Sequence, residues 1–351
     1  MFVVAQLLPE GGCAFRAKPP EGEVFLWGKY MKYAKNLIDA IGNTPLVRLN
    51  AVSKGLKPTI LVKLEYLNPG GSMKDRIGIT MIEEAEKQGL LKKGGTIVEP
   101  TSGNTGAGHA IVAAVKGYKT VFTMSEKMSI EKEFVLKAYG AEVIRCPANV
   151  DIDDPRHYIN VAKQIAMDRH AYFPNQYHNK ANTLGHYKTT GPEIWRDTDG
   201  KITHLVAAVG TGGTISGTAQ YLKEQNSKIK VIGADPDGSL LHHFFYHTKG
   251  KMHPYKVEGP GEDFLPGALD MSMIDEMVVV NDRESFKTAR NLVKKEGIFA
   301  GGSSGLAVFA GLKVAKKLPR NAIVVVILPD SGRSYVSKFY NDEWMKKEGF
   351  L

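Results

Sequence analysis

The sequence predicts an α/β protein with two lobes, each an open and mostly parallel sheet covered by helices. Short runs rich in β-branched residues alternate with helical patterns along almost the whole chain, and this alternation is typical of βαβ units. The apolar run at 323–328 has the length of a buried strand. A chain of 351 residues is also longer than one typical hydrophobic core supports, which favours two domains.

The pattern places each element in turn. The expected strands lie at 59–64, 96–99, 118–124, 141–146, 204–209, 230–235 and 322–328. The expected helices lie at 75–88, 105–115, 130–139, 157–168, 214–223, 284–296, 304–317 and 334–347. The polar stretches at 149–155 and 175–190 are where we expect the chain to pass between lobes. The loop at 244–267 is too long for a plain connector, so we expect it to be functional.

Composition and charge exclude several classes of protein. A hydrophobic content of 43% is ordinary for a globular protein, and no apolar run is long enough to span a membrane. The net charge of +9 is spread along the chain, which favours anionic small molecules over nucleic acid as ligands. Two cysteines, Cys13 and Cys146, cannot form a disulfide framework, so we expect a reducing cytoplasm. Residues 1–30 resemble neither a secretory signal nor a transit peptide and are expected to form an N-terminal arm.

Lys74 is the first candidate for chemistry. It follows the turn Asn-Pro-Gly-Gly-Ser-Met at 68–73 and stands at the start of an amphipathic helix. The positive end of the helix dipole and partial burial both lower the pKa of an amine, which favours the neutral nucleophile needed for a Schiff base. The alternative is an ordinary first-turn lysine in solvent, which is the commoner state of a lysine taken alone.

Three loops rich in Gly, Ser and Thr follow predicted strands, at the edge where α/β sheets bind ligands. The loop at 100–106 offers hydroxyls, an amide and free backbone N–H groups suited to a carboxylate, although Thr101 or Ser102 could instead cap a helix. The second loop opens a helix and suits a small phosphate ester; it consists of Gly210, Thr211, Gly212, Gly213 and Thr214. In the third loop, at 301–305, Ser303 or Ser304 could simply be an N-cap.

Together, Lys74 and the three loops are suited to binding one cofactor, pyridoxal 5′-phosphate. Lys74 would hold the aldehyde as a Schiff base, and residues 210–214 would bind the phosphate. A neutral serine facing the pyridine nitrogen would leave that nitrogen largely unprotonated. A weaker electron sink of this kind favours loss of a β-substituent over transamination.

With these residues assembled, the chain resembles the fold-type-II, tryptophan-synthase-β-like class of pyridoxal-phosphate enzymes. Within that class it is most similar to the catalytic core of the cystathionine β-synthase family, with cysteine synthase (O-acetylserine sulfhydrylase) as a near relative. The likeness runs from about residue 37 to 351. Its motifs are Ile-Gly-Asn-Thr-Pro-Leu-Val-Arg at 41–48 and the segments 68–76, 99–106, 176–177, 210–214, 302–303 and 328–331.

The resemblance implies a role for each matching residue. Lys74 would carry the cofactor and act as acid and base, Asn104 would contact the ring hydroxyl, and Ser303 would face the pyridine nitrogen. The substrate residues would be Thr101, Ser102, Gly103, Thr105, Gln176, Gly259 and Glu262. The implied reaction is β-replacement on serine, activated serine or cysteine by a thiol, in a homodimer. The implied lobes are a larger cofactor-binding one, 31–81 plus 193–351, and a smaller mobile one, 82–192.

The second substrate is the open question. Segments 126–129, 186–190, 235–239, 255–264 and 344–351 look like the cystathionine β-synthase branch, which implies homocysteine and possible release of hydrogen sulfide from cysteine. Animal and yeast-type enzymes carry tyrosine where this chain has Glu262, whereas bacterial-type relatives often carry glutamate. Glu262 would either pair with the amino group of homocysteine or lie solvated in a loop. The alternatives are a cysteine synthase using O-acetylserine and sulfide, a dehydratase, or a catalytically silent basic scaffold.

Two modules of the animal enzymes are not expected. Their haem needs a Cys and a nearby His ahead of the core, but no histidine follows Cys13 before His109, so we expect no haem. The chain ends where the core ends, so we expect no C-terminal regulatory domains and unregulated turnover. No metal site is expected either, because the histidines His242, His243, His247 and His253 lack the Cys/His spacing of a metal centre.

Overall fold

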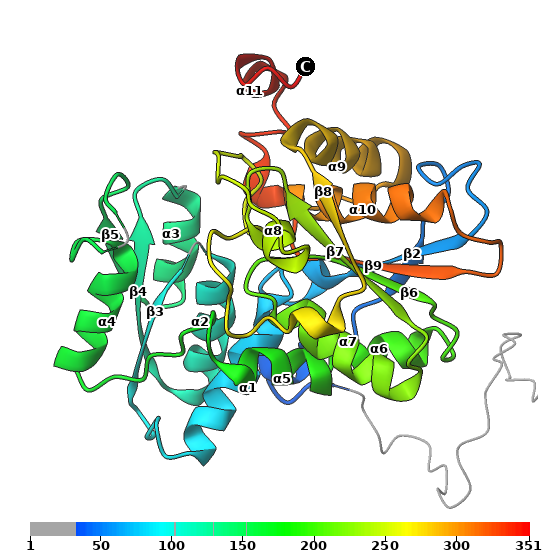
Figure 1. Ribbon diagram of the computed structural model, residues 1–351. Coiled ribbons are helices and arrows are strands. Elements are labelled where there is room, and N and C mark those ends of the chain that lie inside the picture. Colours follow the sequence, from blue (N-terminus) through cyan, green and yellow to red (C-terminus); the bar gives the residue numbers. More distant parts are fainter. Residues whose placement is uncertain (1–32, 102, 129, 152) are drawn as a thin grey trace, which may run out of the picture. The chain divides into compact units, whose positions relative to one another are not determined.

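Two separate sheets organise the computed structural model, which describes residues 33–351 except 102, 129 and 152 (Figure 1). The larger sheet has six strands in the order β1-β2-β9-β6-β7-β8. Only β1 runs antiparallel to its neighbour. The strands are β1 (Leu46–Arg48), β2 (Thr59–Leu64), β6 (His204–Ala208), β7 (Lys230–Pro236), β8 (Glu276–Val280) and β9 (Ile323–Leu328).

Helices cover both faces of the larger sheet. On one face lie α9 (Asp282–Glu296) and α10 (Gly302–Ala315); on the other lies α7 (Gly213–Gln225), backed by α5 (Lys180–Lys188) and α6 (Thr190–Asp197) (Figure 1). Successive side chains of a strand point to opposite faces. Val324 and Val326 of β9 therefore join the core beneath α10, whereas Val325 joins the core beneath α7. Burial on both faces explains why this run is apolar throughout.

The smaller sheet is three-stranded and entirely parallel, in the order β3-β4-β5. Its strands are β3 (Thr96–Pro100), β4 (Lys119–Ser125) and β5 (Glu142–Cys146). Around it lie α2 (Asn104–Lys116), α3 (Ile130–Ala138) and α4 (Tyr158–Asp168). Helix α1 (Lys74–Lys87) packs against α2 and also against α5, so it connects the two sets of helices.

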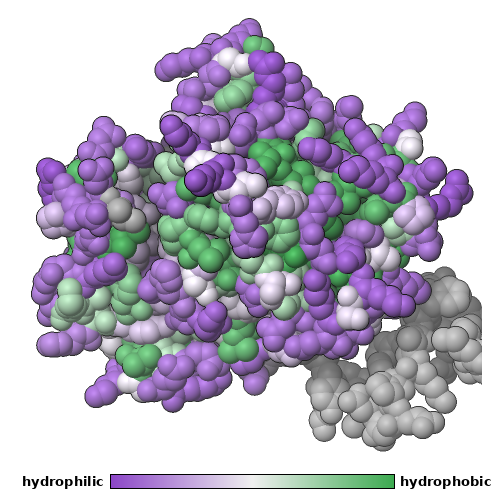
Figure 2. All heavy atoms as spheres, in the orientation of Figure 1, coloured by the Kyte–Doolittle hydropathy of each residue, from purple (hydrophilic) through white to green (hydrophobic). Residues whose placement is uncertain are grey.

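Short helical segments complete the described fold. These are α8 (Leu241–Phe245), α11 (Asp342–Lys347) and the 3-10 turns Leu37–Ala40, Glu65–Leu67, Met271–Met273 and Gly332–Tyr335. On the face shown in Figure 2, hydrophilic side chains predominate and hydrophobic ones lie between them. Among the described residues, no helix has the length and apolarity needed to cross a membrane.

The predicted α/β class is confirmed, and each expected strand is present within two residues of its predicted ends. Strands β1 and β8 and helices α5 and α6 were not expected. The single helix predicted at 334–347 is wrong. The chain makes the turn Gly332–Tyr335 and begins α11 afresh at Asp342, because the Asn341 side chain accepts the amide N–H groups of the new first turn.

Two sequence-based predictions are not tested by this fold. The proposed N-terminal arm, residues 1–30, lies outside the described residues, as does Cys13. The lobe boundaries also stay a prediction. Helix α5 falls within the predicted smaller lobe, yet it packs against α7 of the larger sheet.

Candidate active site

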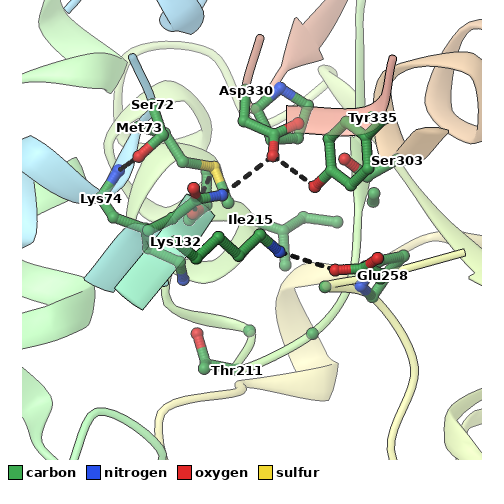
Figure 3. A pocket seen from close by; sticks show the side chains of 18 residues that line it. Ser72, Met73, Lys74, Lys132, Thr211, Ile215, Glu258, Ser303, Asp330 and Tyr335 are labelled. Atoms are coloured by element: carbon green, nitrogen blue, oxygen red, sulfur yellow. Dashed lines mark hydrogen bonds and ion pairs between the residues drawn. The ribbon is translucent and has the colours of Figure 1, made fainter. Parts of the chain in front are cut away.

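One pocket collects most of the candidate residues (Figure 3). Strands β3 and β6 run parallel to their neighbours, and each leads at its carboxyl end into a loop and a helix N-terminus. The pocket lining includes eight residues singled out from the sequence: Lys74, Asn104, Gly210, Thr211, Gly212, Thr214, Gly259 and Ser303. Gly213 is the first residue of α7, directly behind the loop.

Lys74 is the first residue of α1 and is partly buried in the pocket wall. Its backbone N–H donates to Ser72 Oγ at 3.1 Å. Burial lowers the pKa of its amine to about 8, although the carboxylates of Glu262 and Glu99 act in the opposite direction. Its ammonium has no hydrogen-bond or ion-pair partner in the part of the chain that the structure describes. An unpaired amine with a lowered pKa is suited to nucleophilic and acid–base chemistry.

Two carboxyl groups act on Lys74 through their charge. Glu99 is fully buried on β3 and accepts the backbone N–H groups of Asn175 and Gln176 at 2.8 and 3.1 Å. Burial raises its pKa to about 8 despite these bonds. Burial also raises the pKa of Glu262 to about 8, although a hydrogen bond from Tyr177 opposes the shift. Glu262 is only partly exposed.

The glycine-rich loop at 210–214 packs closely against neighbouring segments. A Cβ on Gly210 would lie 2.3 Å from the carbonyl oxygen of Gly259, so the close approach of two backbones requires glycine there. Gly212 caps α7 with φ of +81°, a left-handed conformation that glycine adopts readily. The first N–H groups of α7 and the hydroxyls of Thr211 and Thr214 therefore surround one end of the pocket, which suits an anion.

Neither serine of the third loop caps its helix. The N-cap of α10 is Gly301, and no side chain accepts a bond there. Ser303, the second residue of α10, lines the pocket instead. Asn104 begins α2, and its Nδ2 donates to Asp330 Oδ2 at 2.9 Å. The same oxygen accepts the Tyr335 hydroxyl at 2.7 Å (Figure 3).

Thr101, Gly103 and Thr105, which are predicted to hold a carboxylate, are buried and are not among the described residues that line the pocket, whereas Asn104 of the same loop is. Thr101 Oγ1 accepts the backbone N–H groups of Gly103 and Gly106, both at 3.0 Å, as a helix cap does. Thr105 Oγ1 donates to Gln176 Oε1 at 2.7 Å, and both side chains are buried. Ser102 lies outside the described residues.

Sequence reasoning missed several pocket residues, namely Lys132, Glu258, Asp330 and Tyr335. Glu258 and Asp330 fall inside the motifs that carried the resemblance, so the signal was present there. Lys132, on α3, has no local signal and reaches the pocket only through folding. Among the described residues, no cluster of three or more His, Cys, Asp and Glu side chains could hold a metal; His242 lies against Asp235, and His253 against Asp237.

Comparison with known proteins adds independent evidence. Residues 37–330 match the family model described as "Pyridoxal-phosphate dependent enzyme". The chain is 47% identical over 326 residues to rat cystathionine beta-synthase, covering 92% of this chain and 58% of the rat protein. This chain thus spans little more than half the length of that curated relative.

Two solved structures have closely similar folds. One is the O-acetylserine-dependent cystathionine beta-synthase of Helicobacter pylori, with a TM-score of 0.80, 39% identity, and coverage of 88% of this chain and 99% of that one. The other is a hydrogen sulfide-producing enzyme of Fusobacterium nucleatum, also with a TM-score of 0.80 and 39% identity, covering 86% and 100%.

Proposed function

Because the chain belongs to the pyridoxal-phosphate-dependent enzyme family, we propose that it replaces the β-substituent of serine, or of an activated serine, with the sulfur of a thiol. The thiol we propose is homocysteine. The β-carbon–oxygen bond of serine breaks, a β-carbon–sulfur bond forms, and the products are cystathionine and water. The observation that carries the proposal is the convergence of Lys74, the 210–214 loop and Ser303 on one pocket.

The residues present fit pyridoxal phosphate. The 210–214 loop lies at the N-terminus of α7, where free backbone N–H groups suit a phosphate group. A Cβ on Gly210 or Gly213 would push this loop away from the groups against which it packs. Lys74 would hold the aldehyde carbon, Asn104 the ring hydroxyl and Ser303 the ring nitrogen. When bound, this cofactor withdraws electrons from the α-carbon of the amino acid, which weakens the Cα–H bond and promotes loss of the β-substituent.

Lys74 is proposed to move the α-proton. With a pKa of about 8, its amine is neutral in an appreciable fraction of molecules near neutral pH and can accept a proton there. Thr101, Gly103, Thr105 and Gln176, with Ser102, are proposed to hold the substrate carboxylate. The bond between Thr105 and Gln176 supports this role because it keeps both polar groups together beside the pocket.

Glu262 and Gly259 are proposed to recognise the second substrate. Glu262 lies close enough to Lys74 for each to shift the pKa of the other. Its carboxylate would pair with the ammonium of homocysteine, a contact that sulfide cannot make. Gly259 lines the pocket and follows Glu258 in the same segment.

A product assay tests the proposal. Serine, O-acetylserine and cysteine would each be supplied with homocysteine or with sulfide. We expect cystathionine from homocysteine, with hydrogen sulfide as the second product when cysteine is the first substrate. A preference for sulfide of more than about tenfold, or ~1.4 kcal/mol of transition-state discrimination, would favour a cysteine synthase instead. Protein that stays colourless with added cofactor would favour a silent scaffold.

Assembly, cofactor content and compartment complete the proposal. We propose a haem-free homodimer in the cytoplasm, with the residues 82–192 forming a lobe that moves against 31–81 plus 193–351. The separation of the two sheets supports two lobes, and the shortage of cysteine supports a reducing compartment. Light scattering would test the dimer, and a haem absorbance band in pure protein would contradict the cofactor content.

A further inference from the structure

One face of α5 lies directly beneath the glycine-rich loop. Asn182 and His186 stand four residues apart and so on the same side of this helix, and both are fully buried. The contact with α7 is very close. A Cβ on Gly213 would lie 2.1 Å from Asn182 Oδ1, and one on Gly217 would lie 2.0 Å from the carbonyl oxygen of Thr183. The two glycines of α7 therefore allow these polar side chains to reach the loop.

Each of the two side chains meets one threonine hydroxyl of the loop. Asn182 Nδ2 donates to Thr211 Oγ1 at 3.1 Å and also to the carbonyl oxygen of Gln176 at 2.8 Å. His186 Nε2 lies 3.0 Å from Thr214 Oγ1, and its Nδ1 lies 2.9 Å from Thr190 Oγ1. Thr211 and Thr214 both line the pocket.

The direction of the hydrogen bonds at His186 follows from Met73. Thr214 Oγ1 donates to Met73 Sδ at 3.4 Å, and a hydroxyl has only one proton. In the tautomer consistent with this contact, His186 Nε2 carries the proton of its bond to Thr214, and Nδ1 accepts from Thr190. Burial, together with the positive charge of Arg76, lowers the pKa of His186 to about 3, so the ring is neutral and has a single N–H to donate.

We propose that Asn182 and His186 are positioning residues that preset the hydroxyls of Thr211 and Thr214 as donors to the cofactor phosphate. Each supplies an N–H to a hydroxyl oxygen, which leaves the hydroxyl proton to point at an anion. With phosphate bound, the Thr214 hydroxyl would donate to a phosphate oxygen in place of the weak thioether acceptor, and charge-assisted bonds of this kind are the stronger ones. This inference rests on the proposed assignment of the 210–214 loop to phosphate.

The test compares binding of pyridoxal phosphate and of pyridoxal, which lacks the phosphate, to the cofactor-free protein by fluorescence titration. His186→Met has a similar reach to histidine and no donor, and Asn182→Leu keeps the branched shape of asparagine without the amide. We expect each variant to bind pyridoxal phosphate about tenfold more weakly than the wild type does, with unchanged affinity for pyridoxal. His186→Gln, which keeps an N–H near the Nε2 position, should retain the preference.

Tyr187→Phe is the matched control, because it removes another α5–α7 hydrogen bond, the one to Glu224, at the surface. It should leave both affinities unchanged. Equal losses for pyridoxal phosphate and pyridoxal would show a merely structural role, and a glutamine variant as weak as the methionine variant would exclude the donor. Both results overturn this inference but leave the loop assignment standing. If the wild-type protein binds pyridoxal phosphate no more tightly than pyridoxal, the assignment of the 210–214 loop to phosphate is wrong, and so is this inference. Circular dichroism would show whether each variant folds. If the variant at one of the two positions, His186 or Asn182, fails to fold, the variant at the other position still tests the inference.

Discussion

The ammonium of Lys132 lies 2.7 Å from the carboxylate of Glu258, and both side chains line the pocket (Figure 3). Lys132 belongs to α3, beside the smaller sheet, whereas Glu258 lies in the long segment after α8. Glu258 also pairs with Lys338, and the Lys132 ammonium lies 5.5 Å from the centre of the Tyr335 ring. The ion pair therefore connects helices of the smaller sheet to the C-terminal part of the chain across the pocket.

We expect Lys132→Met to lower kcat/KM for the amino-acid substrate by about tenfold, mainly through a higher KM, because the two sides of the pocket lose their connection. Steady-state kinetics would measure this. Glu258→Gln should have a similar effect. Lys137→Met is the control, since Lys137 lies on the same helix, is half exposed and pairs with Glu133, and neither residue lines the pocket. Variants of Lys132 and Lys137 that behave alike would exclude the bridge as the cause.

Lys74→Ala should abolish product formation and prevent borohydride from trapping the cofactor on the protein, because no other pocket amine is assigned to the aldehyde. The cofactor should still bind through its phosphate. Absorbance after dialysis and peptide mass spectrometry would report both effects. Lys87→Ala, at an exposed position of the same helix, should remain yellow and active. Trapping on Lys132 in the Lys74 variant would show that the assignment is wrong.

Glu262→Gln should move the pH dependence of cofactor capture to lower pH. The negative charge of Glu262 raises the pKa of Lys74, so its removal lets burial lower that pKa further below about 8, and more amine is neutral at a given pH. The rate of cofactor capture by cofactor-free protein, measured against pH, would show the shift.

The same variant should raise the KM for homocysteine more than the KM for serine, since only homocysteine is proposed to pair with this carboxylate. Asp199→Asn removes an exposed surface charge and should change neither quantity. A shift to higher pH would contradict the sign of the interaction between Glu262 and Lys74.

Gly210→Ala should weaken pyridoxal phosphate binding by at least about tenfold, because the new methyl group would meet the Gly259 carbonyl oxygen at 2.3 Å and force two backbones apart. Equilibrium dialysis would measure the change. Backbone conformation is not the reason, since Gly210 does not have a positive φ. Unchanged binding would indicate that the 210–214 loop and the segment around Gly259 can move apart at little cost in free energy.

Glu193→Gln should destabilise the protein by up to about 3–5 kcal/mol near neutral pH, because it removes one of the two carboxylates paired with each buried cation and leaves Arg76 with Glu65 and Lys63 with Asp197. Glu193 accepts from Arg76 and Lys63, each at 2.7 Å. Urea unfolding would measure the loss, and Glu84→Gln, at a surface ion pair, should unfold close to the wild type.

The pH dependence has a definite sign. Burial opposes ionisation of Glu193, but the hydrogen bond and charge of Arg76, together with Lys63, outweigh it and lower its pKa from 4.5 to about 2. A lowered folded-state pKa gives stability that is present above about pH 5 and is lost as pH falls toward 2. The stability of Glu193→Gln should therefore change less than that of the wild type over this range.

The sequence by itself determined the α/β class, most strands, and the loops that meet at the pocket. These are local properties: the valines of β9 and the glycines at 210–213 constrain the backbone wherever they occur. Lys74 was found from its neighbours in the chain, and the structure places it at the start of α1 within the pocket wall. Helices α5 and α6 could not be predicted in this way, because their sequence is polar and contains Gly185 and Gly191.

Only the tertiary structure decided which distant residues meet. Lys132 and Glu258 lie 126 positions apart, and no sequence pattern pairs them. His186 was part of a family motif, but its bond to Thr214 depends on how closely α5 packs against α7. The sequence places Glu262 in a long loop, and in the folded protein its burial near Lys74 raises the pKa of its carboxyl group. Burial and charge interactions act through space, so they appear only when the chain has folded.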